Sequence, residues 1–334
     1  MNNKSILITG GTGSFGRQFV YQVLKNYPKI KRLVIYSRDE LKQDQMRNQF
    51  SEQKYKNLRY FIGDVRDYPR LLRALDGIDI IVHAAALKQV PTAEYNPIEF
   101  IKTNVMGAQN IIEASIEKKI KKVIALSSDK ASAPINLYGA TKLCSDKLFI
   151  AANTYASKEG SYSVVRYGNV MGSRGSIIPK FIKDSKKGIL SITDEKMTRF
   201  NITLQDSVNM VLFAIKNTCG AEILVPKIPS YRILDLASAI GPKCKIKKIG
   251  VRPGEKIHEE MITESDSYST YDIGKYYIIL PNQNKKIVNH YKKYKIKPVK
   301  INFKYNSGTK TDFLTVEKIK KLIKNHVSKN LETF

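Results

Sequence analysis

Apolar, often β-branched residues gather in short runs that recur along the first half of the chain. The clearest of these runs occupy residues 5–9, 32–37, 58–64, 78–86, 121–128 and 162–170. The apolar residues are nearly continuous within each run, as is typical of strands buried on both faces of a parallel sheet. Amphipathic stretches such as residues 98–118 separate the runs and predict helices. The alternation predicts an α/β fold with a doubly wound, Rossmann-type parallel sheet.

The pattern changes in the second half of the chain. Short apolar runs such as 221–226 alternate with loops there, and helices are expected near 204–217 and 314–327. We therefore expect residues 1–170 to form one domain that the strand near 221–226 joins later. Residues 171–334 should mainly form a smaller α+β part that packs on the carboxyl edge of the sheet.

The composition argues against several classes of protein. No apolar run reaches the ~18–20 residues of a membrane span, and the first run is too short for a signal peptide, so we expect a cytoplasmic protein without a membrane span. The cysteines, Cys144, Cys219 and Cys244, are far apart, which disfavours a metal site or a disulfide framework. The net charge of +27 is spread along the chain without a nucleic-acid-binding motif. We interpret it as a lysine-rich surface and expect no nucleic-acid partner.

A glycine-rich turn, "ITGGTGSFGRQF", follows the first strand and opens a helix. Gly11, Gly13 and Gly16 match the dinucleotide fingerprint, and Gly10, Gly13 and Gly16 fit its looser form. Glycines at these positions let the chain turn tightly and let backbone N–H groups approach a pyrophosphate at the helix N-terminus. The strand, turn and helix together predict a dinucleotide site.

The end of the second strand, "YSRDE", indicates which dinucleotide is bound. An acid usually grips the adenosine ribose here, but Ser37 and Arg38 occupy the place and Asp39 follows. A serine and an arginine can hold a 2′-phosphate, which an acid would repel. This favours NADP over NAD. In the alternative, Arg38 is a solvated loop cation and Asp39 holds the ribose.

The stretch "SSDKASAPINLYGATK" gathers the candidate catalytic residues. Tyr138 and Lys142 lie four residues apart, on one face of a helix. A nearby ammonium favours the phenolate, so Tyr138 can remove a hydroxyl proton while hydride leaves the same carbon. Ser128, at the end of a strand, can orient that hydroxyl. Asp129 and Lys130 add an acid and an amine beside it.

Several motifs together resemble the extended short-chain dehydrogenase/reductase superfamily. They resemble most closely its inverting UDP-N-acetylglucosamine 4,6-dehydratases of pseudaminic acid biosynthesis. The likeness covers about residues 4–280, and the chain departs from the family's usual residues at Gln89, Asn201 and Ser128. The motifs that carry it are "ITGGTGSFG", "IYSRDELKQ", "FIGDVRD", "AEYNPIEFIKTN", "NLYGATKLCSDKLF", "VVRYGNVMGSRGS", "ITDEKMTRF", "PKIPS" and "RPGEKIHEEMI".

The resemblance implies a reaction that needs these ionisable groups. Oxidation of C4 acidifies the C5 proton; loss of that proton and of the C6 hydroxyl gives an enone, and the stored hydride returns to C6. Asp129 is the expected acid for the leaving hydroxyl and Lys130 the expected base at C5. We expect Lys142, the nicotinamide charge and burial to lower the pKa of Lys130. A retaining dehydratase, a 4-epimerase and a non-catalytic NADP-sensing or nucleic-acid-binding protein are the alternatives.

The resemblance also implies binding residues and a homo-oligomer, either a dimer or a hexamer. We interpret His83 and His258 as structural, with His258 beside Glu259 and Glu260 on a solvated helix face. The implied NADP-binding residues are Gly10, Thr12, Gly13, Ser14, Phe15, Gly16, Ser37, Arg38, Asp39, Glu40, Leu41, Lys42, Asp64, Val65, Ala84, Ala86, Lys88, Tyr138, Lys142 and Val170. The implied UDP-sugar-binding residues are Lys88, Asn169, Arg199, Arg252 and Glu255.

Overall fold

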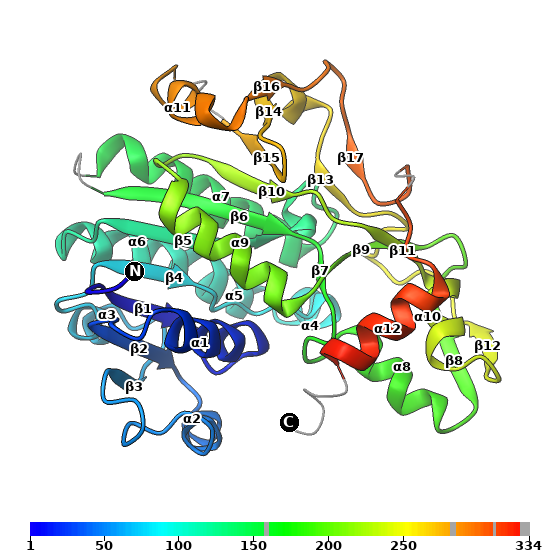
Figure 1. Cartoon of the computed structure of the whole chain (residues 1–334). Helices are drawn as coiled ribbons and strands as arrows, with labels where there is room; N and C mark the ends of the chain where they lie inside the picture. Colours follow the sequence, from blue (N-terminus) through cyan, green and yellow to red (C-terminus); the bar gives the residue numbers. More distant parts are fainter. Residues whose placement is uncertain (157–159, 281–284, 310–311, 328–334) are drawn as a thin grey trace.

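A large twisted sheet forms the centre of the protein in the computed structural model, which describes residues 1–156, 160–280, 285–309 and 312–327. Seven of its strands are parallel, in the order β10-β6-β5-β4-β1-β2-β3 (Figure 1). They are β1 (Ser5–Thr9), β2 (Arg32–Ser37), β3 (Leu58–Ile62), β4 (Ile80–His83), β5 (Lys122–Ser128), β6 (Ser161–Tyr167) and β10 (Ile223–Pro226). This order confirms the predicted Rossmann-type sheet.

Strand β1 lies at the middle of the sheet because its side chains are apolar on both faces. Ile6, Leu7 and Ile8 are fully buried, and β1 pairs with β2 on one side and β4 on the other. The strand order reverses between β1 and β4. In open α/β sheets, ligands bind at the carboxyl ends of the strands beside such a reversal.

Helices cover both faces of this sheet. Helices α1 (Ser14–Asn26) and α9 (Leu204–Asn217) pack together on one face, and α6 (Gly107–Glu117) and α7 (Leu137–Tyr155) on the other (Figure 1). The helix predicted over 98–118 is divided into three elements, two of which precede α6. The other helical elements in the first half of the chain are α2 (Glu40–Arg47), α3 (Tyr68–Ala74), α4 (Val90–Tyr95), α5 (Pro97–Phe100), the π-helix η1 (Ile101–Met106) and the 3₁₀ turn η2 (Asp129–Ala131).

Three antiparallel strands extend the sheet beyond β10, which the sequence pattern did not predict. Strand β15 (Tyr276–Ile279) pairs with β10, and β14 (Thr270–Asp272) and β16 (Lys297–Pro298) continue outward. The short helices nearby are η3 (Ser265–Ser269), α11 (Lys285–His290) and η4 (Tyr291–Tyr294).

A smaller α+β part stands at the carboxyl edge of the parallel strands (Figure 1). Apolar side chains of its helices, with Phe181, Leu236 and Ile319 at the centre, form a second core. Its helices are α8 (Ile177–Ser185), α10 (Ile233–Ile240) and α12 (Val316–His326). Its strands pair as β7 (Asn169–Val170), β9 (Thr198–Ile202) and β11 (Ser230–Arg232), as β8 (Ile189–Ile192) and β12 (Lys245–Lys248), and as β13 (Glu260–Ile262) and β17 (Tyr305–Asn306). Within the described ranges, no helix is long and apolar enough to cross a bilayer.

Candidate active site

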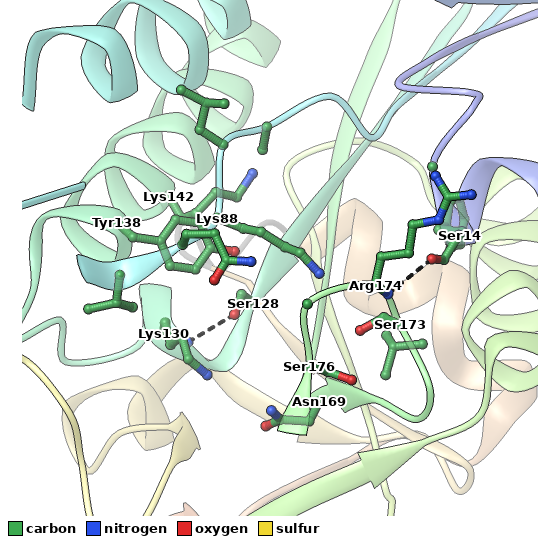
Figure 2. Close-up of a pocket in the computed structure, with 18 of the residues that line it drawn as sticks. Ser14, Lys88, Ser128, Lys130, Tyr138, Lys142, Asn169, Ser173, Arg174 and Ser176 are labelled. Carbon is green, nitrogen blue, oxygen red and sulfur yellow. Dashed lines mark hydrogen bonds between the residues drawn. The ribbon is translucent and has the colours of Figure 1, made fainter. Parts of the chain in front are cut away.

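One cavity of about 870 Å³ lies between the carboxyl edge of the sheet and the smaller part. All of the predicted catalytic, cofactor and substrate residues line it except Glu40 and Leu41. These two begin helix α2 and are exposed, with Leu41 66% exposed. Figure 2 shows Tyr138 and Lys142 on one side of the cavity, with Ser14 on the other. The tertiary structure therefore brings together residues that are more than 200 positions apart.

The glycine turn at one end of the cavity has the shape that a pyrophosphate needs. Gly10 has a φ of +65°, and a Cβ there would lie 2.9 Å from the backbone nitrogen of Ala85. A Cβ on Gly16 would lie 2.2 Å from the carbonyl oxygen of Gly11, so only glycine fits. Helix α1 begins without a side-chain cap. Its first N–H groups can therefore receive an anion.

The end of β2 meets this turn. The Ser37 hydroxyl lies 2.9 Å from the Thr12 hydroxyl. The Arg38 side chain is about half exposed, with its guanidinium 3.6 Å from Asp64. Asp39 caps helix α2 by accepting a 2.9 Å hydrogen bond from the Lys42 backbone nitrogen. The hydrogen bond from the Lys42 side chain lowers the pKa of Asp39. Because both of its oxygens are engaged within α2, the geometry favours Ser37 and Arg38 as the groups that face a ligand.

Strand β5 ends in a tight turn that fixes Asp129 and Lys130. The Ser128 hydroxyl donates to Asp129 Oδ1 at 2.8 Å and accepts from the Lys130 backbone nitrogen at 3.2 Å. Lys130 Nζ lies 3.1 Å from Asp129 Oδ1. Helix α7 packs so tightly on this turn that a Cβ on Gly139 would lie 2.3 Å from the Lys130 carbonyl oxygen.

Helix α7 places Tyr138 and Lys142 against the same turn. The helix begins where the Asn136 side chain accepts from the Gly139 nitrogen at 2.8 Å. Both residues of the pair are buried, and Lys142 Nζ donates to the Leu126 carbonyl oxygen at 2.7 Å. Burial raises the pKa of Tyr138. The sequence had suggested that the charge of Lys142 would favour the phenolate, but in the structure the charge that opposes the rise is that of Lys130.

The environment of Lys130 differs from the expected one. Its ammonium lies 3.1 Å from Asp129 and 3.0 Å from Glu259. Burial alone lowers the pKa of Lys130, but the two carboxylates outweigh it and raise that pKa. The expectation that Lys142 and burial would lower it is therefore wrong for the protein by itself.

Glu259 is the functional candidate that the sequence reasoning missed. The expected helix around His258 is wrong, because these residues form an irregular segment that leads into β13. Glu259 is 2% exposed and lines the cavity, whereas His258 turns away and bonds Thr198. The signal available in the sequence was an acid at the end of "RPGEKIHE", but no local pattern links that acid to Lys130.

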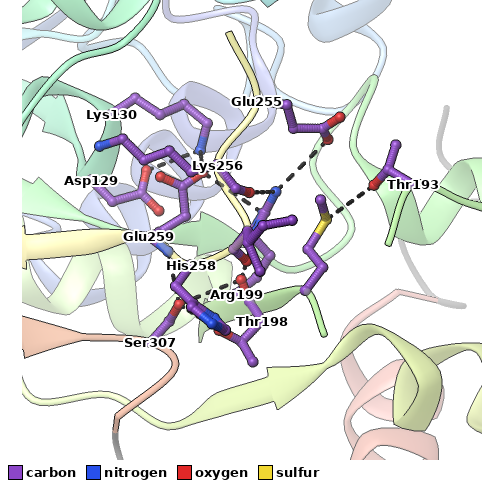
Figure 3. A network of polar contacts seen from close by, with 12 residues as sticks. Asp129, Lys130, Thr193, Thr198, Arg199, Glu255, Lys256, His258, Glu259 and Ser307 are labelled. Carbon is purple, nitrogen blue, oxygen red and sulfur yellow. Dashed lines mark hydrogen bonds and ion pairs between the residues drawn. The ribbon is translucent and has the colours of Figure 1, made fainter. Parts of the chain in front are cut away.

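Arg199, which was expected to hold the diphosphate, is engaged with the protein itself. It is 8% exposed, and its guanidinium donates to the carbonyl oxygens of Thr198, Ile257 and Lys256 at 2.7, 3.0 and 2.9 Å. It also lies 3.7 Å from Glu259 (Figure 3). These contacts make Arg199 the anchor of the segment that carries Glu259.

Arg252 and Arg174 are two further arginines that line the cavity, and both are more exposed than Arg199. Arg252 donates to Glu255 from Nε and Nη2 at 3.0 and 3.1 Å, and its side chain is 59% exposed. Arg174, which was not predicted, follows the "GNVMGS" turn, and its backbone nitrogen donates to the Ser14 hydroxyl at 3.3 Å. Figure 2 shows its side chain extending beside Ser14, across the cavity from Lys88. Burial, reinforced by Lys130, lowers the pKa of Lys88.

The sequence and fold both match those of known proteins. Residues 6–281 match a family described as "Polysaccharide biosynthesis protein". A Campylobacter jejuni protein named UDP-N-acetylglucosamine 4,6-dehydratase (inverting) is 55% identical over 84% of each chain. A Rickettsia canadensis protein named UDP-glucose 4-epimerase is 43% identical over 99% of this chain and 98% of its own.

Two solved structures have a similar fold. The X-ray structure of Pen from Bacillus thuringiensis superposes with a TM-score of 0.87 and 34% identity, covering 100% of this chain and 99% of its own. The dTDP-glucose 4,6-dehydratase DesIV of Streptomyces venezuelae, solved with NAD bound, gives a TM-score of 0.66 over 76% of this chain and 86% of its own. At 22% identity, DesIV shows the fold alone. The chain therefore belongs to the polysaccharide biosynthesis protein family of extended short-chain dehydrogenases/reductases, as do the inverting UDP-N-acetylglucosamine 4,6-dehydratases.

Proposed function

We propose that this protein is an NADP-dependent hydro-lyase that converts UDP-N-acetylglucosamine into UDP-2-acetamido-2,6-dideoxy-L-arabino-hexos-4-ulose, with inversion at C5. The observation that carries the proposal is the position of Lys130, whose Nζ lies 3.1 Å from Asp129 beside buried Tyr138. An amine and a carboxyl next to the phenol supply a base and an acid in addition to the group that removes a hydroxyl proton. The name of the Campylobacter jejuni relative supports the same assignment.

The reaction begins at C4 of the sugar. Tyr138 removes the proton of the C4 hydroxyl, which Ser128 orients. A nicotinamide cofactor bound in the cavity would supply the acceptor for the hydride of C4 and the donor of the hydride to C6. Tyr138, Lys142 and Ser128 all line the cavity. The glycine turn, in which Gly10 and Gly16 leave no room for a Cβ, is of the kind that holds the pyrophosphate of such a cofactor.

The elimination is assigned to the residues of the β5 turn. Once C4 is a ketone, the C5 proton is acidic and Lys130 removes it. Asp129 donates a proton to the C6 oxygen, which leaves as water, and the C5–C6 double bond forms. After hydride has reached C6, a proton added to the opposite face of C5 gives the inverted product.

A UDP-sugar 4-epimerase is the second candidate, because Rickettsia relatives with that name are 42–46% identical. An epimerase only oxidises and reduces C4, so it has no use for an acid and a base at C5 and C6. A retaining dehydratase would carry a glutamate where Lys130 stands. The amine of Lys130 beside buried Asp129 therefore favours the inverting dehydratase.

We also propose the partners and context of the enzyme. Ser37 and Arg38 support NADP as the cofactor, since an arginine at this place can pair with a 2′-phosphate. Residues 1–170 bind NADP and residues 171–334 mainly bind the UDP-sugar, with Arg252 at the diphosphate and Glu255 at the ribose. The enzyme acts as a homo-oligomer, a dimer or hexamer, in the cytoplasm, in bacterial surface-sugar biosynthesis of the pseudaminic acid type.

Turnover in heavy water tests the proposal. The protein is incubated with UDP-N-acetylglucosamine and NADP, and the product is examined by NMR. We expect loss of the C6 hydroxyl, deuterium at C5 and ring-proton couplings of the L-arabino configuration. A D-xylo product with deuterium at C5 would identify a retaining enzyme, and UDP-N-acetylgalactosamine would identify an epimerase.

A further inference from the structure

Lys130 is held by two carboxylates that come from different parts of the chain. Asp129 precedes it in the β5 turn, and Glu259 reaches it from the segment before β13, at 3.1 and 3.0 Å from Nζ. Figure 3 shows both acids pointing toward the same ammonium. Asp129 has a role in the proposed elimination, whereas Glu259 has none so far.

The two acids are buried and only partly satisfied. Glu259 and Asp129 are 2% and 1% exposed. Glu259 Oε2 and Asp129 Oδ2 have no hydrogen-bond partner among the described residues. Leaving a buried carboxylate oxygen unpaired is costly, so the arrangement is not explained by stability alone. Both residues line the cavity.

The charges around the two acids are unequal. Glu259 lies close to Arg199 as well as to Lys130, which together lower its pKa despite the opposing effect of burial. Burial and the charge of Glu259 raise the pKa of Asp129, although Lys130 opposes them. Two acids with environments this different serve different roles, one as a fixed charge and one as a proton carrier.

We propose that Glu259 is a positioning residue for the elimination step: it holds the Lys130 amine in place, and its negative charge sets the pH range in which Asp129 and Lys130 share one proton. This inference rests on the proposed dehydratase function. The pair needs one proton in total, because Asp129 must donate and Lys130 must accept.

The protons balance over the elimination step. When the sugar is in place, an N–H bond of the Lys130 ammonium breaks and an O–H bond forms on Asp129. The neutral amine still donates one N–H to Glu259, and its lone pair takes the C5 proton. Asp129 gives its proton to the C6 oxygen, which leaves as water. The pair returns to an ammonium and a carboxylate, and Glu259 stays ionised throughout.

The direction of the pH effect follows from this account. The pair is inactive when it gains a second proton at low pH and when it loses its only proton at high pH, so the elimination has a bell-shaped pH profile. A fixed negative charge favours proton binding and raises both limits. Removing the charge of Glu259 therefore moves both limbs to lower pH. The other ionisable groups that influence the pair or Glu259 are Lys88 after β4, Tyr138 on α7, Arg199 on β9, Tyr231 on β11 and Lys256 before β13.

The test compares Glu259→Gln with wild type in full-length enzyme. The rate of C5 deuterium incorporation from heavy water is measured from pH 5 to 10 at saturating UDP-N-acetylglucosamine. We expect both limbs to move down by roughly one pH unit, since a charge at this distance shifts a pKa by 1–3. The maximal rate should fall about tenfold, while KM and the formation of reduced cofactor on substrate addition change little.

Glu260→Gln is the matched control. Glu260 is the next residue of the same segment and lies outside the cavity lining, so its variant should keep the wild-type profile. Glu259→Asp retains the charge at a shorter reach; its bell should stay at the wild-type pH with a lower maximum. If Glu259→Gln does not fold, Glu259→Asp still tests the inference, because a pH profile displaced downward in that variant would overturn it.

The possible results separate the two proposals. An unshifted profile in Glu259→Gln, or a profile displaced downward in Glu259→Asp, would overturn the role of Glu259. A wild-type enzyme that forms no dehydrated product would instead overturn the proposed function. In Glu259→Gln, a lower rate without a change in the pH profile would mean that Glu259 is only structural, against the inference.

Discussion

The hydroxyl groups of Thr12 and Ser37 lie 2.9 Å apart, so the glycine turn after β1 and the end of β2 meet at one point of the cavity. Arg38 follows directly and extends from this point, while Asp39 is occupied as the cap of α2. The combination leaves a hydroxyl and a guanidinium, rather than a carboxylate, for the adenosine ribose of the proposed cofactor.

Replacing Arg38 by Ala should weaken NADP binding at least tenfold and leave NAD binding nearly unchanged. A charge-assisted hydrogen bond to a phosphate contributes about 1.5–3 kcal/mol, and NAD has no 2′-phosphate. Calorimetric titration with both dinucleotides measures the difference. Arg47→Ala is the control, because Arg47 is the last residue of α2 and pairs with Glu52 outside the cavity. Equal losses for the two cofactors would remove the 2′-phosphate assignment.

Tyr138→Phe should abolish the first hydride transfer, so that no reduced cofactor absorbs at 340 nm after UDP-N-acetylglucosamine is added. Only one oxygen is lost, so binding of the UDP-sugar should remain. Tyr167→Phe is the control, since Tyr167 is equally buried in the same cavity. If Tyr138→Phe still reduces the cofactor at the wild-type rate, another group removes the C4 hydroxyl proton.

The rate of that first hydride transfer should rise with pH. Burial raises the pKa of Tyr138, while Lys130 opposes the rise, and the phenolate is the reactive form. The fraction of phenolate grows as pH increases toward the pKa, so stopped-flow rates should increase from pH 6 to 9. A rate that falls over this range would show that the phenolate is not the base.

Lys130→Met should stop deuterium incorporation at C5 while reduced cofactor still forms. Methionine matches the lysine side chain as far as Cε but has no amine to accept the proton. Mass spectrometry of the sugar after incubation in heavy water measures the exchange. Lys180→Met, at another part of the cavity lining, should exchange normally because its ammonium pairs with Asp184. Exchange that persists in Lys130→Met would exclude Lys130 as the C5 base.

Arg252 and Arg199 should respond differently to substitution. Arg252→Ala should raise KM for the UDP-sugar roughly tenfold or more with an unchanged Tm. The Arg252 side chain is exposed at the cavity, and among the described residues its guanidinium forms ion pairs and hydrogen bonds only with Glu255. Arg199→Ala should lower the Tm, because the carbonyl oxygens and carboxylates around Arg199 would lose their buried partner. Thermal unfolding and steady-state kinetics of both variants separate these effects. A KM effect in Arg199→Ala without loss of stability would restore its original assignment to the diphosphate.

The sequence by itself determined the parallel sheet and the local parts of the site. Strands β1 and β2 and helix α9 have the predicted bounds because continuous β-branched runs and a 3.6-residue period are local signals. The glycine turn and the Tyr138–Lys142 spacing are local as well: a positive φ at Gly10 and one helix face for residues four apart follow from the backbone alone. The resemblance of the motifs also implied that the distant residues Arg252 and Glu255 bind the UDP-sugar, and both line the cavity.

Only the tertiary structure decided what surrounds each charge. Glu259 lies 129 positions from Lys130 in the sequence, yet its carboxylate is 3.0 Å from the amine. That contact, together with Asp129, reverses the expected direction of the pKa of Lys130. Arg199 likewise lies in the motif "ITDEKMTRF", and the resemblance implied that it binds the UDP-sugar. In the structure, however, its guanidinium donates to backbone carbonyl oxygens of residues 256–257. The sequence gives the type of each side chain. The pKa and the contact partners of that side chain depend on burial and on charges within a few ångströms, and the packing of distant segments determines both.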